Sequence, residues 1–227
     1  MVKAVLFDFD DTLGNREDYA YRFFKDIIEE NTAIADPLEK EALLQDIMLW
    51  DEHGNIKKSH ITDMLKEKYN IVLPYDDFKT YWNDHLWEYT VPFAGAYETL
   101  KELSKSYKLG IITNGPSYGQ HKKLEKSGLL EFFDEEHIIV SGDYGFHKPD
   151  VRLFEIAAEK MNVDTSDCVF VGDIFANDIL GSLKVGMKAV WIWNGRRNSS
   201  LDIPIIHDIT ELAETIKRVE NGEYSFV

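Results

Sequence analysis

A chain of 227 residues can form one large domain or two small ones, and 44% hydrophobic residues provide for a sizeable core. The 25 Lys and Arg residues are outnumbered by 41 Asp and Glu, and the formal net charge of −16 argues against partners that need basic patches, namely nucleic acid and anionic membranes. The single cysteine, Cys168, excludes an internal disulfide, and no apolar run reaches membrane-spanning length. We therefore expect a reduced, soluble, cytoplasmic protein.

Short apolar runs rich in β-branched and aromatic residues recur along the chain and end in Asp, Asn, Gly or Ser. Their apolarity is continuous rather than alternating, which is typical of strands buried on both faces of a parallel sheet. The predicted strands are Val5–Asp8, Leu109–Thr113, Ile138–Ser141, Cys168–Gly172, Ala189–Trp193 and Ile203–His207.

One stretch after the first strand has a different pattern. From Glu17 to about Tyr89 there is no convincing buried strand, and the large aromatics there fit a core between helices. Asp36 and Pro37 are typical of a helix start. Four helices are predicted, over Glu17–Glu30, Leu38–Trp50, Lys57–Tyr69 and Asp76–Tyr89. We expect a small helical-bundle cap domain at 16–91, inserted into a core made of 1–15 and 92–227.

Amphipathic helical patterns separate the later strands. They cover Ala96–Tyr107, Asp150–Met161, Asn177–Val185 and Ile209–Val219. Strands that alternate with helices in this way predict a doubly wound, mostly parallel, Rossmann-like α/β fold.

In open α/β sheets, ligands bind beyond the carboxyl ends of the strands. Four segments at or after predicted strand ends carry carboxylates, a hydroxyl, an amide and a lysine: Asp8–Thr12, Thr113–Gly115, His147–Asp150 and Gly172–Asp178. Asp8 and Asp10 lie two positions apart, which in an extended chain turns both to one side and Phe9 into the core. We expect the four segments to converge on one edge of the sheet.

Clustered carboxylates need a cation, and oxygen ligands suit a hard ion such as Mg²⁺. Asp8, Asp10, Asp173 and Asp178 bring four negative charges, whereas Mg²⁺ and Lys148 supply three positive ones. A protonated Asp10 would balance this count before substrate arrives, and that is the state that a general acid needs. The pattern therefore predicts a magnesium site beside a proton donor.

The same residues resemble the four motifs of the haloacid dehalogenase-like (HAD) hydrolase superfamily. The matching segments, in order, are Asp8-Phe9-Asp10-Asp11-Thr12-Leu13, Thr113-Asn114, Lys148-Pro149, and Gly172-Asp173 with Asn177-Asp178. The likeness is to phosphatases with a helical cap after the first strand, with a weaker likeness to the nucleotidase and acylneuraminate-phosphate phosphatase branch.

The resemblance implies a phosphatase that hydrolyses a small phosphorylated metabolite, of the sugar phosphate or nucleoside monophosphate class. Asp8 would form an aspartyl-phosphate intermediate, and Asp10 would act as general acid and then as general base. Thr113 and Asn114 would bind the phosphoryl oxygens. Lys148 would neutralise charge at the nucleophile and the phosphoryl group.

The resemblance also implies Mg²⁺ as cofactor. Its ligands would be Asp8, the backbone carbonyl of Asp10, and Asp173. Asp178 would be an outer ligand or would orient the metal's waters.

Other functions stay open at this point. A phosphomutase shares the aspartyl-phosphate, whereas a haloacid dehalogenase needs no metal and no acid at the position of Asp10. A non-enzymatic module that binds a phosphorylated ligand is a third alternative. Arg196 and Arg197, after the fifth strand, either contact substrate anions or lie in a solvated loop. The sequence identifies neither the substrate nor the oligomeric state, for which we expect a monomer or a homodimer.

Overall fold

The structure is a computed structural model, and it describes residues 1–193, 195 and 199–226. Arg196 and Arg197, for which a substrate contact was considered, lie outside the described residues. The chain forms two compact units. One joins Met1–Gly14 to Pro92–Val227, and the other is Asn15–Val91.

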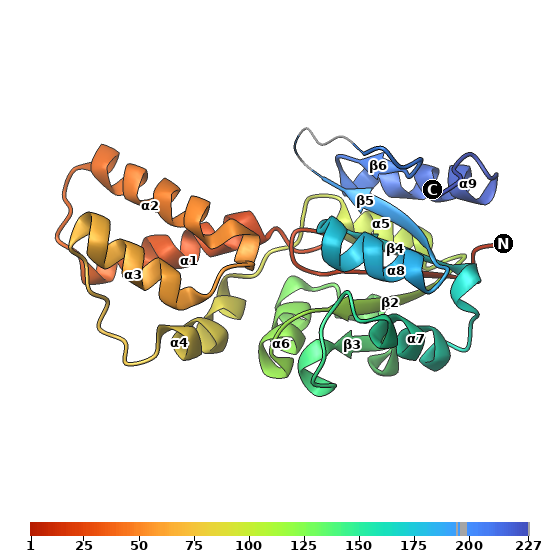
Figure 1. The fold of residues 1–227 in the computed structure, drawn as a ribbon, viewed down its shortest axis with the longest axis horizontal. Helices are drawn as coiled ribbons and strands as arrows, with labels where there is room; N and C mark the ends of the chain where they lie inside the picture. The colour runs from red at the N-terminus through yellow and green to blue at the C-terminus, as the bar shows by residue number, and fades with distance from the viewer. Residues whose placement is uncertain (194, 196–198, 227) are drawn as a thin grey trace. The chain divides into compact units, whose positions relative to one another are not determined.

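The first unit is built on a parallel sheet, which among the described residues has six strands in the order β3-β2-β1-β4-β5-β6 (Figure 1). The strand order runs outward in both directions from β1, so the crevice between β1 and β4 is a topological switch point, where such sheets bind ligands. The doubly wound Rossmann-like fold is therefore confirmed. The strands are β1 Ala4–Phe7, β2 Lys108–Thr113, β3 Ile138–Val140, β4 Cys168–Gly172, β5 Lys188–Ile192 and β6 Ile205–Ile206.

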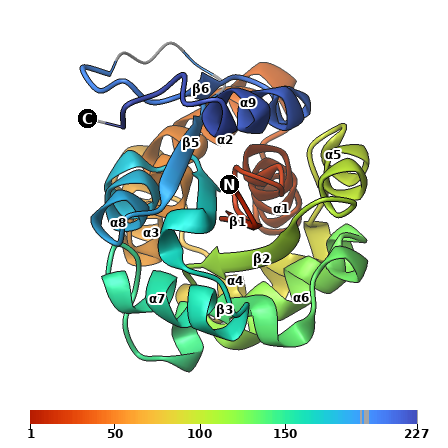
Figure 2. The ribbon, with the colours of Figure 1, turned by 90° about the vertical axis from the view of Figure 1, so that its right-hand side faces the viewer.

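Helices cover both faces of the sheet (Figure 2). Val5 and Phe7 belong to the apolar cluster under α5, α6 and α9, whereas Ala4 and Leu6 belong to the cluster under α7 on the opposite face. Side chains that alternate between two buried faces explain why the strands are continuously apolar. The helices are α5 Ala96–Leu103, α6 Ser117–Ser127, α7 Val151–Lys160, α8 Leu180–Lys184 and α9 Leu212–Glu220.

Some elements differ from the prediction. Helix α6 was not predicted, because its sequence SYGQHKKLEKS has one large aliphatic residue, Leu124, and no visible apolar stripe. The predicted helix Asn177–Val185 begins instead as a π-helix over Phe175–Ile179 and continues as α8. The sixth strand is shorter than predicted, and Pro204, which precedes it, has no N–H for the ladder.

The second unit, whose residues are all described, is a bundle of helices. Asn15, Asp36 and Asp77 cap the starts of α1, α2 and α4, each accepting a hydrogen bond from a backbone N–H in the first turn. Its apolar core includes the rings of Phe23 and Phe24, each 5.0 Å from the Trp82 ring. The helices are α1 Arg16–Asn31, α2 Pro37–Asp51, α3 Lys58–Tyr69 and α4 Phe78–His85.

A charged cluster is also buried in this unit. The carboxylate of Asp51 is fully buried and pairs with Arg16, 2.6 Å away, and with Lys58. Burial alone would raise the pKa of Asp51, but the two cations outweigh it and lower that pKa. The cluster ties together the starts of α1 and α3 and the end of α2.

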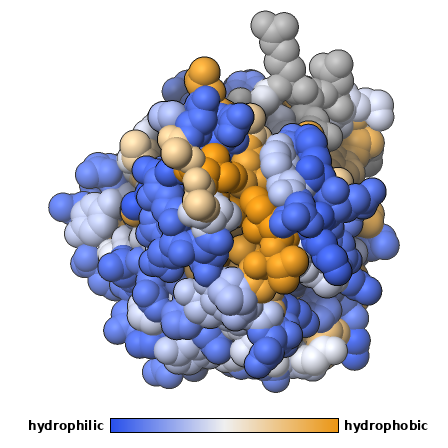
Figure 3. Space-filling model, turned by 90° about the vertical axis from the view of Figure 1, so that its left-hand side faces the viewer, coloured by the Kyte–Doolittle hydropathy of each residue, from blue (hydrophilic) through white to orange (hydrophobic). Residues whose placement is uncertain are grey.

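The face of the molecule in Figure 3 shows apolar side chains gathered between hydrophilic ones. The most exposed large aliphatic residues of the helical unit are Leu38, Leu49 and Val72. None of the helices that the structure describes is long and apolar enough to cross a membrane.

Candidate active site

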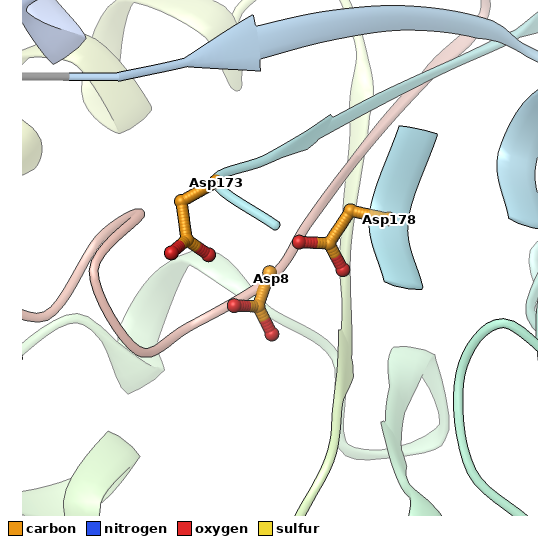
Figure 4. A group of neighbouring side chains, drawn as sticks. All are labelled: Asp8, Asp173 and Asp178. Atoms are coloured by element: carbon orange, nitrogen blue, oxygen red, sulfur yellow. The ribbon is translucent and has the colours of Figure 1, made fainter. Parts of the chain in front are cut away.

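The described part of the chain brings three buried carboxylates together at the carboxyl edge of the sheet. Asp8 directly follows β1, Asp173 directly follows β4, and Asp178 lies in the π-helix beyond β4. One carboxylate oxygen of each lies within 4.8 Å of one of each of the others (Figure 4). The pairing of β1 with β4 produces this arrangement, because it aligns Phe7 with Val171 and so brings the two strand ends together.

Lys148 supplies a positive charge inside this group. Its Nζ lies 2.6 Å from Asp8 Oδ1 and 2.7 Å from Asp178 Oδ1, and its side chain is only 2% exposed. Burial alone would lower the pKa of Lys148, but the two carboxylates outweigh it and raise that pKa, so the lysine stays charged.

Asn114 holds the backbone of Lys148 from the end of β2. Its Oδ1 accepts a hydrogen bond from the Lys148 N–H at 2.8 Å, and its Nδ2 donates to the Lys148 carbonyl at 3.2 Å. The side-chain amide of Asn114 therefore fixes the lysine-bearing loop. Binding of a phosphoryl oxygen by the backbone amide of Asn114 stays a prediction.

The three buried carboxylates repel one another. Burial raises the pKa of Asp8 to about 7, with Asp178 and Asp10 adding to the rise and Lys148 opposing it. Burial, with the charges of Asp8 and Asp178, also raises the pKa of Asp173 well above its usual value. Among the described residues, Asp173 Oδ1 is buried with no hydrogen-bond partner. A hard divalent cation would satisfy this oxygen and relieve the repulsion, so the residues fit a Mg²⁺ site.

Asp10 has its own partners, on α6. Lys123 Nζ lies 2.8 Å from both carboxylate oxygens of Asp10, and Gln120 Nε2 donates to Oδ2 at 3.0 Å. The same Nε2 also lies 3.1 Å from Thr113 Oγ1 and 2.6 Å from the Asn114 carbonyl oxygen. One amide thus links the acid after β1 to the hydroxyl at the end of β2.

Sequence reasoning missed Gln120 and Lys123. The signal that could have found them is their spacing, three apart in a segment after the second strand, because residues so spaced share one face of a helix.

Two other residues near the site have local partners. His147 Nδ1 lies 2.9 Å from Ser141 Oγ, and the Asp11 N–H donates to the Gly14 carbonyl at 2.8 Å.

Comparison with known proteins points to one family. The sequence model of the haloacid dehalogenase-like hydrolases matches residues 5–192. A glyceraldehyde 3-phosphate phosphatase from Methanothermobacter thermautotrophicus is 32% identical over 230 residues, which cover 95% of this chain and 100% of that protein. A pyrimidine 5′-nucleotidase from Escherichia coli is 37% identical over 106 residues, 46% of each chain.

A solved structure supports the fold. It is a HAD hydrolase from Bacillus subtilis, described as bound to magnesium and as revealing interdomain movement. It superimposes with a TM-score of 0.70 at 24% identity and covers 94% of this chain and 97% of its own.

Proposed function

Because the chain belongs to the haloacid dehalogenase-like hydrolases, and relatives along almost its whole length are phosphatases, we propose that it is a Mg²⁺-dependent phosphatase of small phosphorylated metabolites. The observation that carries this proposal is the buried group of Asp8, Asp173 and Asp178 around Lys148, at the switch point of the sheet. A nucleophilic carboxylate, cation ligands and a fixed ammonium at one point are what phosphoryl transfer needs.

The metal would be held by Asp8, Asp173 and the backbone carbonyl of Asp10, with Asp178 as an outer partner. When bound, Mg²⁺ supplies positive charge against the carboxylates and the transferring phosphoryl group. The orphaned Asp173 Oδ1 supports this assignment.

Lys123 changes the charge count of the site. With Lys123 and Lys148 both beside the acids, two lysines and Mg²⁺ offset all four carboxylates, of Asp8, Asp10, Asp173 and Asp178. Charge balance in the resting site therefore does not require a protonated Asp10. We place the uptake of a proton by Asp10 at the arrival of the phosphoryl group, whose negative charge favours the protonated acid.

In the first step, the carboxylate of Asp8 attacks phosphorus, so a bond forms between them as the bond from phosphorus to the leaving oxygen breaks. Asp10 gives its proton to that oxygen, and the alcohol departs. In the second step, a water attacks the phosphoryl group on Asp8 and passes a proton to Asp10. Inorganic phosphate leaves, and the Asp8 carboxylate is restored. Lys148 and the Thr113 hydroxyl stabilise the phosphoryl oxygens throughout.

We propose triose phosphates as the leading substrates. Support comes from the coverage of the relatives: the one named for glyceraldehyde 3-phosphate aligns over its entire length, whereas the one named for pyrimidine nucleotides aligns over 46%. The helical unit, which we propose selects the substrate, lies outside the four motifs. Similarity over the full length is therefore a better guide to the substrate than similarity over the motifs alone.

The helical unit Asn15–Val91 would act as the cap that selects substrate and excludes water from the reaction. The movement described for the Bacillus subtilis structure supports this role. A cytoplasmic location and a monomeric or homodimeric state stay predictions.

The test is phosphate release from p-nitrophenyl phosphate with Mg²⁺ and with EDTA, followed by a panel of triose, pentose and hexose phosphates and nucleoside monophosphates. We expect metal-dependent release and the highest kcat/KM with a triose phosphate. Conversion of a sugar phosphate to its isomer without release of phosphate would identify a phosphomutase. A folded protein that transfers phosphate from none of the panel would contradict the proposal.

A further inference from the structure

Helix α6 presents two polar side chains to the acid of the site. Gln120 is 3% exposed and Lys123 is 7% exposed, and both contact Asp10. Burying an amide and an ammonium is costly unless both are well paired. Here both make charge-assisted hydrogen bonds to the same carboxylate, which is the stronger kind of hydrogen bond.

From these contacts we infer that Gln120 and Lys123 are positioning residues, which hold the Asp10 carboxylate in place for the leaving-group oxygen. The inference rests on the proposed function, because it takes Asp10 to be the proton donor. Lys123 contacts both carboxylate oxygens at 2.8 Å, and Gln120 contacts one of them at 3.0 Å. Donors that contact both oxygens restrict the rotation of a carboxylate as well as its position.

Gln120 also ties this acid to the proposed phosphate-binding residues. Its Nε2 lies within hydrogen-bond distance of Asp10, of the Thr113 hydroxyl and of the Asn114 carbonyl, and its two hydrogens are shared among these three acceptors. The distance between the proton donor and the phosphoryl oxygens is therefore set through one rigid amide. A displacement of about 1 Å at such a point can cost on the order of 100-fold in rate.

Two observations favour this role over simple packing. Among the described residues, Gln120 Oε1 is buried without a hydrogen-bond partner, which is unfavourable for stability and is tolerated where the other end of the amide is needed. In addition, Gly115 makes room for the amide, because a Cβ on Gly115 would lie 2.8 Å from Gln120 Nε2. The glycine after Thr113-Asn114 thus allows Gln120 to reach Asp10.

The test uses the full-length protein and the variants Lys123→Met and Gln120→Met, which keep the length of the side chain and remove its polar group. Each is assayed for kcat/KM with p-nitrophenyl phosphate and with an alkyl phosphate, glycerol phosphate. Nitrophenolate leaves readily without a proton, whereas an alkoxide needs one. The value of kcat/KM reports the step in which the leaving group departs. A misplaced proton donor therefore lowers kcat/KM for the alkyl phosphate more than for p-nitrophenyl phosphate.

We expect the alkyl phosphate to lose at least about tenfold more kcat/KM than p-nitrophenyl phosphate in both variants. Both substrates are measured on the same preparation, so a partly unfolded variant cannot produce this difference. The control is Lys122→Met, which removes an exposed lysine of the same helix that pairs with Glu125, and both of its values should equal those of the wild type.

Equal losses on the two substrates, or no loss on either, would overturn the inference and leave Gln120 and Lys123 with a structural role. That result would leave the proposed function standing, because the wild type would still release phosphate. A wild type that is inactive with both substrates would instead overturn the proposed function and this inference with it. If Lys123→Met does not fold, Gln120→Met decides the question alone.

Discussion

Gly172 lies directly against the side chain of Asp178. A Cβ on Gly172 would lie 2.5 Å from both Cβ and Cγ of Asp178, and real Cβ atoms do not approach that closely. Asp178 is also held by a hydrogen bond, which its Oδ2 accepts from the Ile174 N–H at 2.9 Å. The absence of a side chain at Gly172 thus allows the Asp178 carboxylate to lie where it does.

Gly172→Ala should therefore displace Asp178 and loosen its contact with Lys148. We expect a loss of about 1–3 kcal/mol in the free energy of unfolding and a clear loss of activity at saturating Mg²⁺. Chemical unfolding and phosphate release measure the two effects. Gly186→Ala is the control: its Cβ would meet nothing within 4 Å, but its φ of +80° costs about 1–2 kcal/mol. That variant should lose stability and keep its activity.

Asp8→Asn should abolish turnover while the protein stays folded, because an amide is no nucleophile toward phosphorus. We expect phosphate release to fall by at least about 10³-fold. In the wild type, mass spectrometry after rapid quenching should find the phosphoryl adduct on Asp8. Asp11→Asn, at the neighbouring acid, is the control and should retain most of the activity. An Asp8→Asn protein with the wild-type rate would remove Asp8 from the mechanism.

Lys148→Met should destabilise the protein, because it leaves the buried carboxylates of Asp8 and Asp178 without their cation. Removal of one partner from a buried ion pair costs about 3–5 kcal/mol. Added Mg²⁺ should recover part of this loss by binding the buried carboxylates that the lysine no longer compensates, which urea unfolding with and without Mg²⁺ would measure. Lys105→Met breaks an exposed pair with Glu102 and should change the stability by less than about 1 kcal/mol.

The metal-free protein should become less stable as the pH rises. Burial raises the pKa of Asp8 to about 7, so between about pH 4 and pH 7 the folded chain binds more protons than the unfolded chain. The free energy of unfolding in EDTA should therefore fall across that range. Mg²⁺ must displace the same protons, so its apparent affinity should rise over the same range. A Mg²⁺ affinity that does not change with pH would show that Asp8 is already ionised at the acid end.

The sequence was most informative where chemistry and backbone pattern coincide. The first strand is continuously apolar and stops at Asp8, so both the strand and the acid were visible, and Phe9 lies in the core as expected. Helix α6 could not be predicted, because its sequence has no apolar pattern that reveals its buried face. Its buried face is made of Gln120, Lys123 and Leu124 together with small residues, and buried polar side chains do not produce an apolar period.

The positions of loop side chains could not be predicted from the sequence either. Asn114 was expected at the site, but its two hydrogen bonds to the backbone of Lys148 depend on a contact between segments far apart in the chain. The π-helix that carries Asp178 was predicted as an ordinary helix, because propensity and periodicity barely distinguish the two.

The chain leaves the sheet-bearing unit at Gly14 and returns to it at Pro92, and these two residues form a β-bridge. The first and last residues of the helical unit are also joined, since the Asn15 N–H donates to the Val91 carbonyl at 2.9 Å. An insertion whose two ends meet can be exchanged as a cassette: a short turn between Gly14 and Pro92 would close the parent fold at little entropic cost. Because we propose that the helical unit selects the substrate, recombination at this pair of residues would give the same sheet a different specificity.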